Sequence, residues 1–152
     1  MRRSEREITN REEIDDILRR APVVHVAMVD NGEPYVVPMH FGYDGKCLYL
    51  HSAPEGRKID VLRRNPRVSF ETFVDFEYVP ATEACGWSTR YRSVIGAGAA
   101  SFITAREEKI KALDTLMSKV TTGPFVYTEK GMAAVTIIKV TIETISGKKL
   151  GY

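Results

Sequence analysis

The sequence predicts a mainly β protein: a small barrel of six antiparallel strands with peripheral helices, in a single domain spanning residues 1–152. Three observations support this prediction. Alternating apolar and polar residues recur along the chain, tight-turn signals such as Asp30-Asn31-Gly32 and Asp44-Gly45 join several of these runs, and few helical segments intervene. Strands joined by short turns pair antiparallel, and about six of them favour a closed barrel.

Three segments have the periodicity of a helix. Thr9-Asn10-Arg11-Glu12 has the pattern of a capping box, and an apolar face follows it as far as Leu18. A short helix is expected at residues 59–64, because Asn65-Pro66 would stop it there. A second capping box begins at Thr104 and opens a longer helix.

The predicted strand from Tyr35 to Tyr43 contains Pro38 in its middle. Proline cannot donate a ladder hydrogen bond, so this strand is expected to be interrupted, bulged or at an edge of the sheet. An edge strand is the simpler explanation, whereas an interruption would let a ligand lie against backbone groups. The six predicted strands are Val23–Val29, Tyr35–Tyr43, Cys47–His51, Arg67–Val79, Tyr91–Ile103 and Met132–Ile145.

Composition excludes several classes of protein. The net charge of +2 is too small to indicate a nucleic-acid partner. Cys47 and Cys85 form neither a disulfide framework nor a zinc motif, and no metal site is expected. No apolar run approaches the roughly 20 residues that a membrane helix needs, and the N-terminus lacks a secretory signal. We therefore expect a cytoplasmic protein with no membrane or nucleic-acid partner.

Arg57 and Lys58 fall in the first turn of the helix predicted after Cys47–His51. Cations are unfavourable there, because the helix dipole favours negative charge at this end. Two adjacent cations beside unpaired helix N–H groups suit a bound anion, and phosphate is the usual ligand. The alternative is that both side chains are simply solvated.

Two further patterns bear on function. His40 and His51 come from neighbouring strands of one predicted hairpin, without partners at metal-binding spacing. Gly96-Ala97-Gly98 is not a dinucleotide fingerprint, because it lacks the third glycine and lies inside a strand.

Residues 85–94 combine the only tryptophan, Trp87, with Tyr91 and two arginines. Arginine beside aromatic rings suits a planar anionic ligand or a partner surface. An ordinary interface strand with Trp87 filling the core is the alternative.

Five segments in a fixed order resemble the FMN-binding split-barrel group typified by pyridoxamine 5′-phosphate oxidase, and most closely its nitroimidazole-resistance-type branch. The resemblance runs from about residue 8 to residue 149 and implies a six-stranded antiparallel split barrel. The segments are Pro34–Phe41, Leu48–Ser52, Gly56–Lys58, Asn65–Phe70 and Tyr91–Gly96.

The resemblance also implies a site shared by two subunits of a homodimer. Arg57 and Lys58 match the pair that binds the FMN phosphate, and His51 replaces the tyrosine of the oxidase, as in the nitroimidazole-resistance branch. At position 93 this chain has serine where the oxidase has glutamine, which weakens the assignment of Ser93 as a flavin contact. The cofactor-binding residues expected are Tyr35, Val36, Val37, Pro38, Met39, His40, His51, Ser52, Arg57 and Lys58, with Trp87, Arg92 and Ser93 from the partner subunit.

The function that follows is an FMN-dependent oxidoreductase that reduces a small electron-poor substrate, such as a nitroaromatic, with nicotinamide-derived electrons. His51 is the expected catalytic residue, because an unperturbed imidazole titrates near physiological pH. The Arg-rich tail of true pyridoxamine phosphate oxidases has no counterpart after Gly147, which argues against the vitamin substrate. The alternatives are a non-enzymatic flavin-binding or sensor protein, and a barrel that binds haem or single-stranded nucleic acid.

Overall fold

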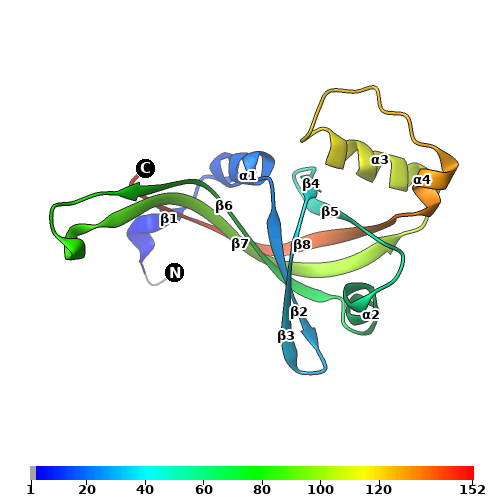
Figure 1. Cartoon of the computed structure of the whole chain (residues 1–152), viewed down its shortest axis with the longest axis horizontal. Helices are drawn as coiled ribbons and strands as arrows, with labels where there is room; N and C mark the ends of the chain where they lie inside the picture. The colour runs from blue at the N-terminus through cyan, green and yellow to red at the C-terminus, as the bar shows by residue number, and fades with distance from the viewer. Residues whose placement is uncertain (1–2) are drawn as a thin grey trace.

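An antiparallel sheet of eight strands forms the centre of the computed structural model, which describes residues 3–152 (Figure 1). The predicted fold class is therefore confirmed, with two strands more than expected. The strands are β1 (Glu7–Ile8), β2 (Val24–Asp30), β3 (Glu33–Met39), β4 (Phe41–Tyr43), β5 (Cys47–Ser52), β6 (Arg67–Val79), β7 (Ser88–Ile103) and β8 (Thr136–Leu150).

The strand order is β3-β2-β6-β7-β8-β5-β4, and β1 pairs with the outer end of β8. The strand predicted from Tyr35 to Tyr43 is in fact two strands separated by His40. The reason is that β3 pairs with β2 whereas β4 pairs with β5, so the chain crosses from one edge of the sheet to the other at this residue. The sheet consequently curls until its edges meet at His40, which produces the barrel.

Helices lie at the periphery, and both predicted capping boxes were wrong in detail. Asn10, rather than Thr9, caps the first helix by accepting a hydrogen bond from the Glu12 N–H at 2.9 Å. Thr104 does not cap the third helix, whose N-cap residue Ala105 offers no side-chain acceptor. The helices are α1 (Arg11–Arg20), α2 (Arg57–Arg64), α3 (Arg106–Met117) and α4 (Glu129–Ala133), with short 3-10 turns at Ser4–Arg6 and Ala84–Gly86.

The last strand begins later than predicted, because Met132 belongs to α4. The Lys109 ammonium group of α3 donates hydrogen bonds to the Met132 carbonyl and, at 2.6 Å, to the Val135 carbonyl. These bonds satisfy carbonyl groups at and beyond the end of α4, which keeps residues 132–135 out of the sheet. The strand β8 then continues past Ile145 to Leu150, because β7 pairs with it along this length.

The barrel interior holds the main hydrophobic core. Ile59 and Val61 of α2 lie in this core with residues of α1 and of the strands, so the first turn of α2 has a fixed position against the sheet. The largest fully buried side chains of this core are Phe41, Phe70, Ile17, Leu18, Leu48, Leu50, Ile59, Ile138, Val24, Val26 and Val61.

The hairpin of β6 and β7 extends well beyond the barrel and forms a long arm, at the left of Figure 1. A register shift between Val74 and Glu77 marks the outer part of this arm. Its aromatic side chains are exposed: Phe76 by 48%, Tyr78 by 71% and Trp87 by 55%. Trp87 is therefore not a core residue in the isolated chain.

Gly98 lies where β7 and β8 approach each other most closely. A Cβ atom placed there would be 2.0 Å from the Thr141 carbonyl oxygen, beside the register shift after Ala97. We expect Gly98→Ala to destabilise the protein by about 3 kcal/mol, because backbone must move to make room. Thermal unfolding should show a loss of roughly 6–12 °C. The exposed Ser101→Ala on the same strand is the control, and an unchanged unfolding temperature in Gly98→Ala would contradict this account.

Candidate functional site

The start of α2 is an open, uncapped helix N-terminus. Its N-cap residue Gly56 has φ of +121°, and no side chain caps the helix. Apart from its chain neighbours, a Cβ atom placed on Gly56 would meet nothing within 4 Å, so the space beside this residue is open. The Gly56 carbonyl accepts bonds from the Ile59 and Asp60 N–H groups, whereas the N–H groups of Arg57 and Lys58 precede the first helical bond. This is the geometry in which helices bind anions.

Arg57 is held in place from two sides. Its Nε donates to Asp30 Oδ2 at 2.9 Å, and its guanidinium group lies 4.3 Å from the centre of the Tyr35 ring. The two Nη atoms have no hydrogen-bond partner among the described residues, and the Arg57 side chain is 58% exposed. The side chain is therefore oriented by the protein while its terminal nitrogens stay available to a ligand. Arg57 and Lys58 lie in the first turn of α2, as predicted.

Asp30 is a site residue that sequence reasoning missed. It is the last residue of β2 and also accepts a hydrogen bond from Arg64 Nη2 at 2.7 Å. The hydrogen bond from Arg57 lowers the pKa of the Asp30 carboxyl below its usual value. The sequence showed Asp30 only as part of a turn signal, and its partner Arg57 is 27 positions away.

His40 and His51 form a second group, as their neighbouring predicted strands suggested. Their ring centres are 6.3 Å apart at an interplanar angle of 60°. Burial lowers the pKa of His40, and the nearby charges of Lys119 and His51 lower it further. Lys119 is held above the Phe41 ring and donates to the carbonyls at the end of α1. His51 is exposed at the end of β5, while Ser52 after it is buried.

The segment from Tyr35 to His40 forms a free edge. The strand β3 pairs only with β2, and Pro38 lies opposite His25 without breaking that pairing. The edge explanation for Pro38 is thus confirmed. Tyr35, Val37 and Met39 face the core, whereas Val36 and Pro38 are exposed, so the predicted alternation holds. Within the described residues, backbone groups along the outer edge of β3 have no strand partner.

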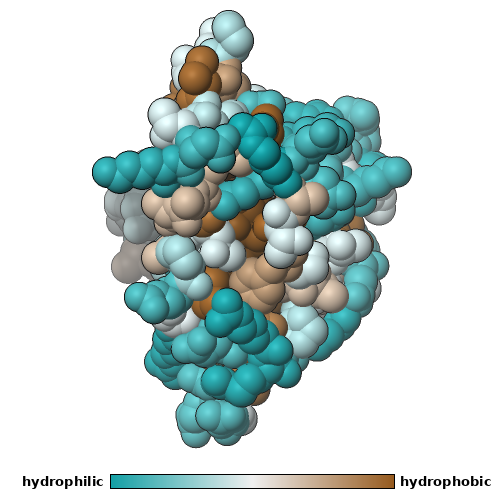
Figure 2. Space-filling model, turned by 90° about the vertical axis from the view of Figure 1, so that its right-hand side faces the viewer, coloured by the Kyte–Doolittle hydropathy of each residue, from teal (hydrophilic) through white to brown (hydrophobic). Residues whose placement is uncertain are grey.

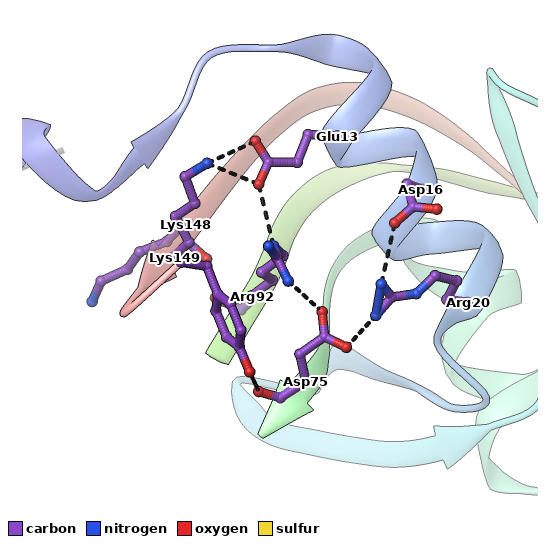
Figure 3. Close-up of polar contacts among 9 residues, drawn as sticks. Glu13, Asp16, Arg20, Asp75, Arg92, Lys148 and Lys149 are labelled. Atoms are coloured by element: carbon purple, nitrogen blue, oxygen red, sulfur yellow. Dashed lines mark hydrogen bonds and ion pairs between the residues drawn. The ribbon is translucent and has the colours of Figure 1, made fainter. Parts of the chain in front are cut away.

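Arg92 and Ser93 lie on the arm, and Arg92 belongs to a network of ion pairs (Figure 3). Arg92 donates to Asp75 Oδ2 at 2.7 Å and to Glu13 Oε1 at 3.3 Å, and its guanidinium group lies 4.0 Å from the centre of the Tyr152 ring. The Ser93 hydroxyl donates to the Lys148 carbonyl at 3.4 Å. Arg92 thus connects the arm to α1 and to the end of the chain.

Asp75 is the centre of this network. It has a positive φ of 57° at the register shift of β6, and its carboxylate binds both Arg92 and Arg20 (Figure 3). Glu13 in turn accepts from Lys149 Nζ at 3.0 Å. These contacts fix the outer part of the arm against α1 and β8.

The structure brings the predicted residues together in separate groups rather than in one. Arg57 and Tyr35 meet at the start of α2, and His40 and His51 form another pair. Trp87 lies near the tip of the arm, which is at the left of Figure 1, well away from α2 in its right-hand half. Within residues 3–152, no cluster of His, Cys, Asp and Glu is arranged to bind a metal ion. In the same residues, no helix has the length and apolar character needed to cross a membrane.

A sequence model of the pyridoxamine 5′-phosphate oxidase family matches residues 10–149. The chain belongs to this family. A candidate 5-nitroimidazole antibiotic resistance protein from Bacteroides thetaiotaomicron is 37% identical in sequence and has a TM-score of 0.85, with 94% of this chain and 86% of that one covered. The predicted resemblance to the nitroimidazole-resistance-type branch of the pyridoxamine 5′-phosphate oxidase family is thereby confirmed.

A FAD- and haem-binding protein from Mycobacterium smegmatis is also similar to this chain. It is 27% identical with a TM-score of 0.86, and the match covers 97% of this chain and 74% of that one. Among curated proteins, an uncharacterized protein of Rhizobium meliloti is 34% identical over 64 residues. The chain matches only 42% of that relative's length.

Proposed function

We propose that this protein is a homodimeric flavoprotein that binds FMN between its subunits and reduces a small electron-poor substrate, such as a nitroaromatic, with electrons from a nicotinamide donor. The observation that carries the proposal is the anion site at the start of α2. There an uncapped helix N-terminus coincides with an arginine already oriented by Asp30 and Tyr35. A terminal phosphate is the ligand that this arrangement suits best.

The residues present fit both ends of FMN. Arg57, Lys58 and the Ser52 hydroxyl would hold the phosphate. The face that carries α2, α3 and α4 has apolar surface between hydrophilic borders, as Figure 2 shows, and the connection from β5 to α2 runs along this side in Figure 1. Apolar surface is suited to an aromatic ring system. The unpaired edge from Tyr35 to His40 would offer it backbone hydrogen bonds.

Bound flavin supplies the hydride or electron transfer, and the protein supplies binding, orientation and electrostatics. His51 is the residue that we assign to proton delivery. It is exposed at the end of β5, one residue before Ser52 and shortly before the proposed phosphate site. Its imidazole could therefore reach a substrate beside the ring without contacting the phosphate.

A second copy of the chain is the proposed partner. Four large apolar side chains on the outer face of β2, β3, β6 and β7 are about half exposed: Val29 49%, Val36 56%, Phe73 46% and Ile95 56%. Large exposed apolar side chains gathered on one face, here beside the His25–Glu71 ion pair, are typical of an interface. Because the arm tip and α2 lie well apart within one chain (Figure 1), Trp87 could approach a ligand bound at Arg57 only from a partner. A twofold dimer would create two such composite sites.

Ile95→Glu tests this interface. A charge placed on this exposed face, which the dimer would bury, should convert a dimer into a monomer and weaken FMN binding, because half of each site would be lost. Sedimentation velocity and flavin fluorescence would measure both effects. Thr9→Glu is the control, since Thr9 is exposed and lies between β1 and α1, away from the proposed interface and from the face assigned to the flavin. A stable monomer of the parent protein that still binds FMN tightly would refute the dimer.

The first experiment is the visible spectrum of the purified protein, followed by stopped-flow mixing with NADPH or NADH. Flavin absorption bands that bleach with a nicotinamide donor support the enzyme. A flavin that stays oxidised favours a binding or sensor protein instead. A second candidate is haem binding, because the similar Mycobacterium smegmatis protein binds FAD and haem. A Soret band in place of the flavin bands would favour it.

A further inference from the structure

We propose that Asp30 is a positioning residue that sets the preference of this site for phosphorylated over unphosphorylated flavin, by holding Arg57 ready for the phosphate. This inference rests on the proposed function, in which Arg57 and Lys58 bind the FMN phosphate. It adds a residue from a different strand and assigns it a role through Arg57 rather than through contact with the ligand.

The carboxylate of Asp30 is hydrogen-bonded to two arginines that are more exposed than Asp30 itself. Each of its oxygens accepts one charge-assisted hydrogen bond, from Arg57 Nε at 2.9 Å and from Arg64 Nη2 at 2.7 Å. The Asp30 side chain is only 15% exposed, whereas those of Arg57 and Arg64 are 58% and 53% exposed. A ligand arriving from solvent therefore meets the guanidinium groups first and Asp30 last.

Asp30 accepts its hydrogen bond from Arg57 Nε, which leaves the two terminal nitrogens of Arg57 for a phosphate. With Nε bound to Asp30 and the guanidinium face against Tyr35, both Nη atoms remain free. Together they form one edge of the planar group that binds phosphate oxygens in pairs. A free arginine side chain loses about 2 kcal/mol of rotamer entropy when it is fixed. Asp30 and Tyr35 impose much of that loss during folding, so less remains to oppose binding.

A second effect of Asp30 would act in the opposite direction. Its negative charge repels a phosphate, so removing it could strengthen FMN binding. Two features make this repulsion the smaller effect. One carboxylate faces two guanidinium groups, so the cluster stays cationic. The two arginines also separate Asp30 from the open side of the site. The sign of the change in FMN affinity therefore distinguishes positioning from simple charge.

Asp30→Asn is the first variant, because it keeps the shape of the side chain and removes its charge. We expect FMN affinity, measured by flavin fluorescence, to fall about 10-fold, because the freed Arg57 side chain would lose its rotamer entropy on binding rather than during folding. Riboflavin affinity should change by less than about twofold, because riboflavin has no phosphate for Arg57 to bind. A role in stability alone would lower both affinities together.

Asp60→Asn is the matched control. Asp60 is in the first turn of the same helix, is exposed, and lies 4.0 Å from Arg63. Its removal deletes one negative charge near the phosphate site without releasing Arg57, so FMN affinity should stay the same or rise. Asp30→Glu is the second variant: it keeps the charge but moves the carboxylate by one methylene, and it should also weaken FMN binding more than riboflavin binding.

The decisive comparison repeats Asp30→Asn in an Arg57→Ala background. If Asp30 acts through Arg57, it should then have no further effect on FMN affinity. An unchanged 10-fold loss without Arg57, or an Asp30→Asn variant that behaves like Asp60→Asn, overturns the inference. If Arg57→Ala itself leaves the preference for FMN over riboflavin intact, the proposed phosphate site fails instead. The two failures are therefore distinguishable.

Discussion

Replacing His51 with alanine should lower the turnover of a nitroaromatic substrate by about 10²-fold or more while FMN remains bound. The imidazole is exposed at the end of β5 and is the best-placed proton donor next to the proposed flavin site. Steady-state rates, with the flavin content of each sample, would measure both quantities.

His51→Gln is the companion variant. Glutamine can donate a hydrogen bond but cannot deliver a proton as imidazolium does, so it should be as slow as alanine. If glutamine restores turnover, His51 orients the substrate and does not deliver a proton. If the alanine variant loses FMN, the histidine is a cofactor ligand. Full turnover with FMN bound would show that its role is structural.

The double replacement of Arg57 and Lys58 by alanine should weaken FMN binding by about 10²–10⁴-fold. Two charge-assisted hydrogen bonds of roughly 1.5–3 kcal/mol each would be lost, and each 1.4 kcal/mol is a factor of ten. Riboflavin binding should change far less, because riboflavin lacks the phosphate. Titration of the apoprotein with each flavin, followed by fluorescence, measures the two dissociation constants.

Arg106→Ala with Lys111→Ala is the control for the loss of two positive charges. Both residues are exposed, and Arg106 also lies in the first turn of a helix, α3. This pair should leave both flavin affinities nearly unchanged. Equal losses of FMN and riboflavin binding in the Arg57 and Lys58 variant would refute the phosphate assignment.

Local sequence patterns predicted the elements well where neighbours in the chain decide the structure. Asn31 and Gly32 have positive φ values of 53° and 90°, as the turn signal between β2 and β3 requires. Arg57 and Lys58 do begin α2, and the helix ends at Arg64, with Asn65 as its C-cap residue before Pro66. Capping boxes were less reliable. Before α1 the adjacent residues Thr9 and Asn10 can each serve as the N-cap, and packing selects Asn10.

The break at His40 shows where local patterns fail. The alternation of residues 35–43 continues across His40 without interruption, since the odd-numbered side chains of both strands face the core. Only the pairing partners change, from β2 to β5. Pairing with a distant strand depends on how the whole sheet closes, which leaves no local signature.

The sequence by itself determined the antiparallel barrel, the turn positions, the family, and the cationic start of α2 as a phosphate-site hypothesis. Periodicity, turn residues and helix dipoles act over a few residues, so they can be recognised in the chain. Only the tertiary structure decided that Asp30 orients Arg57, 27 residues away, and that Arg92 pairs with Glu13, 79 residues away. Such ion pairs depend on which surfaces meet when strands and helices pack, and that geometry is absent from any local stretch of sequence.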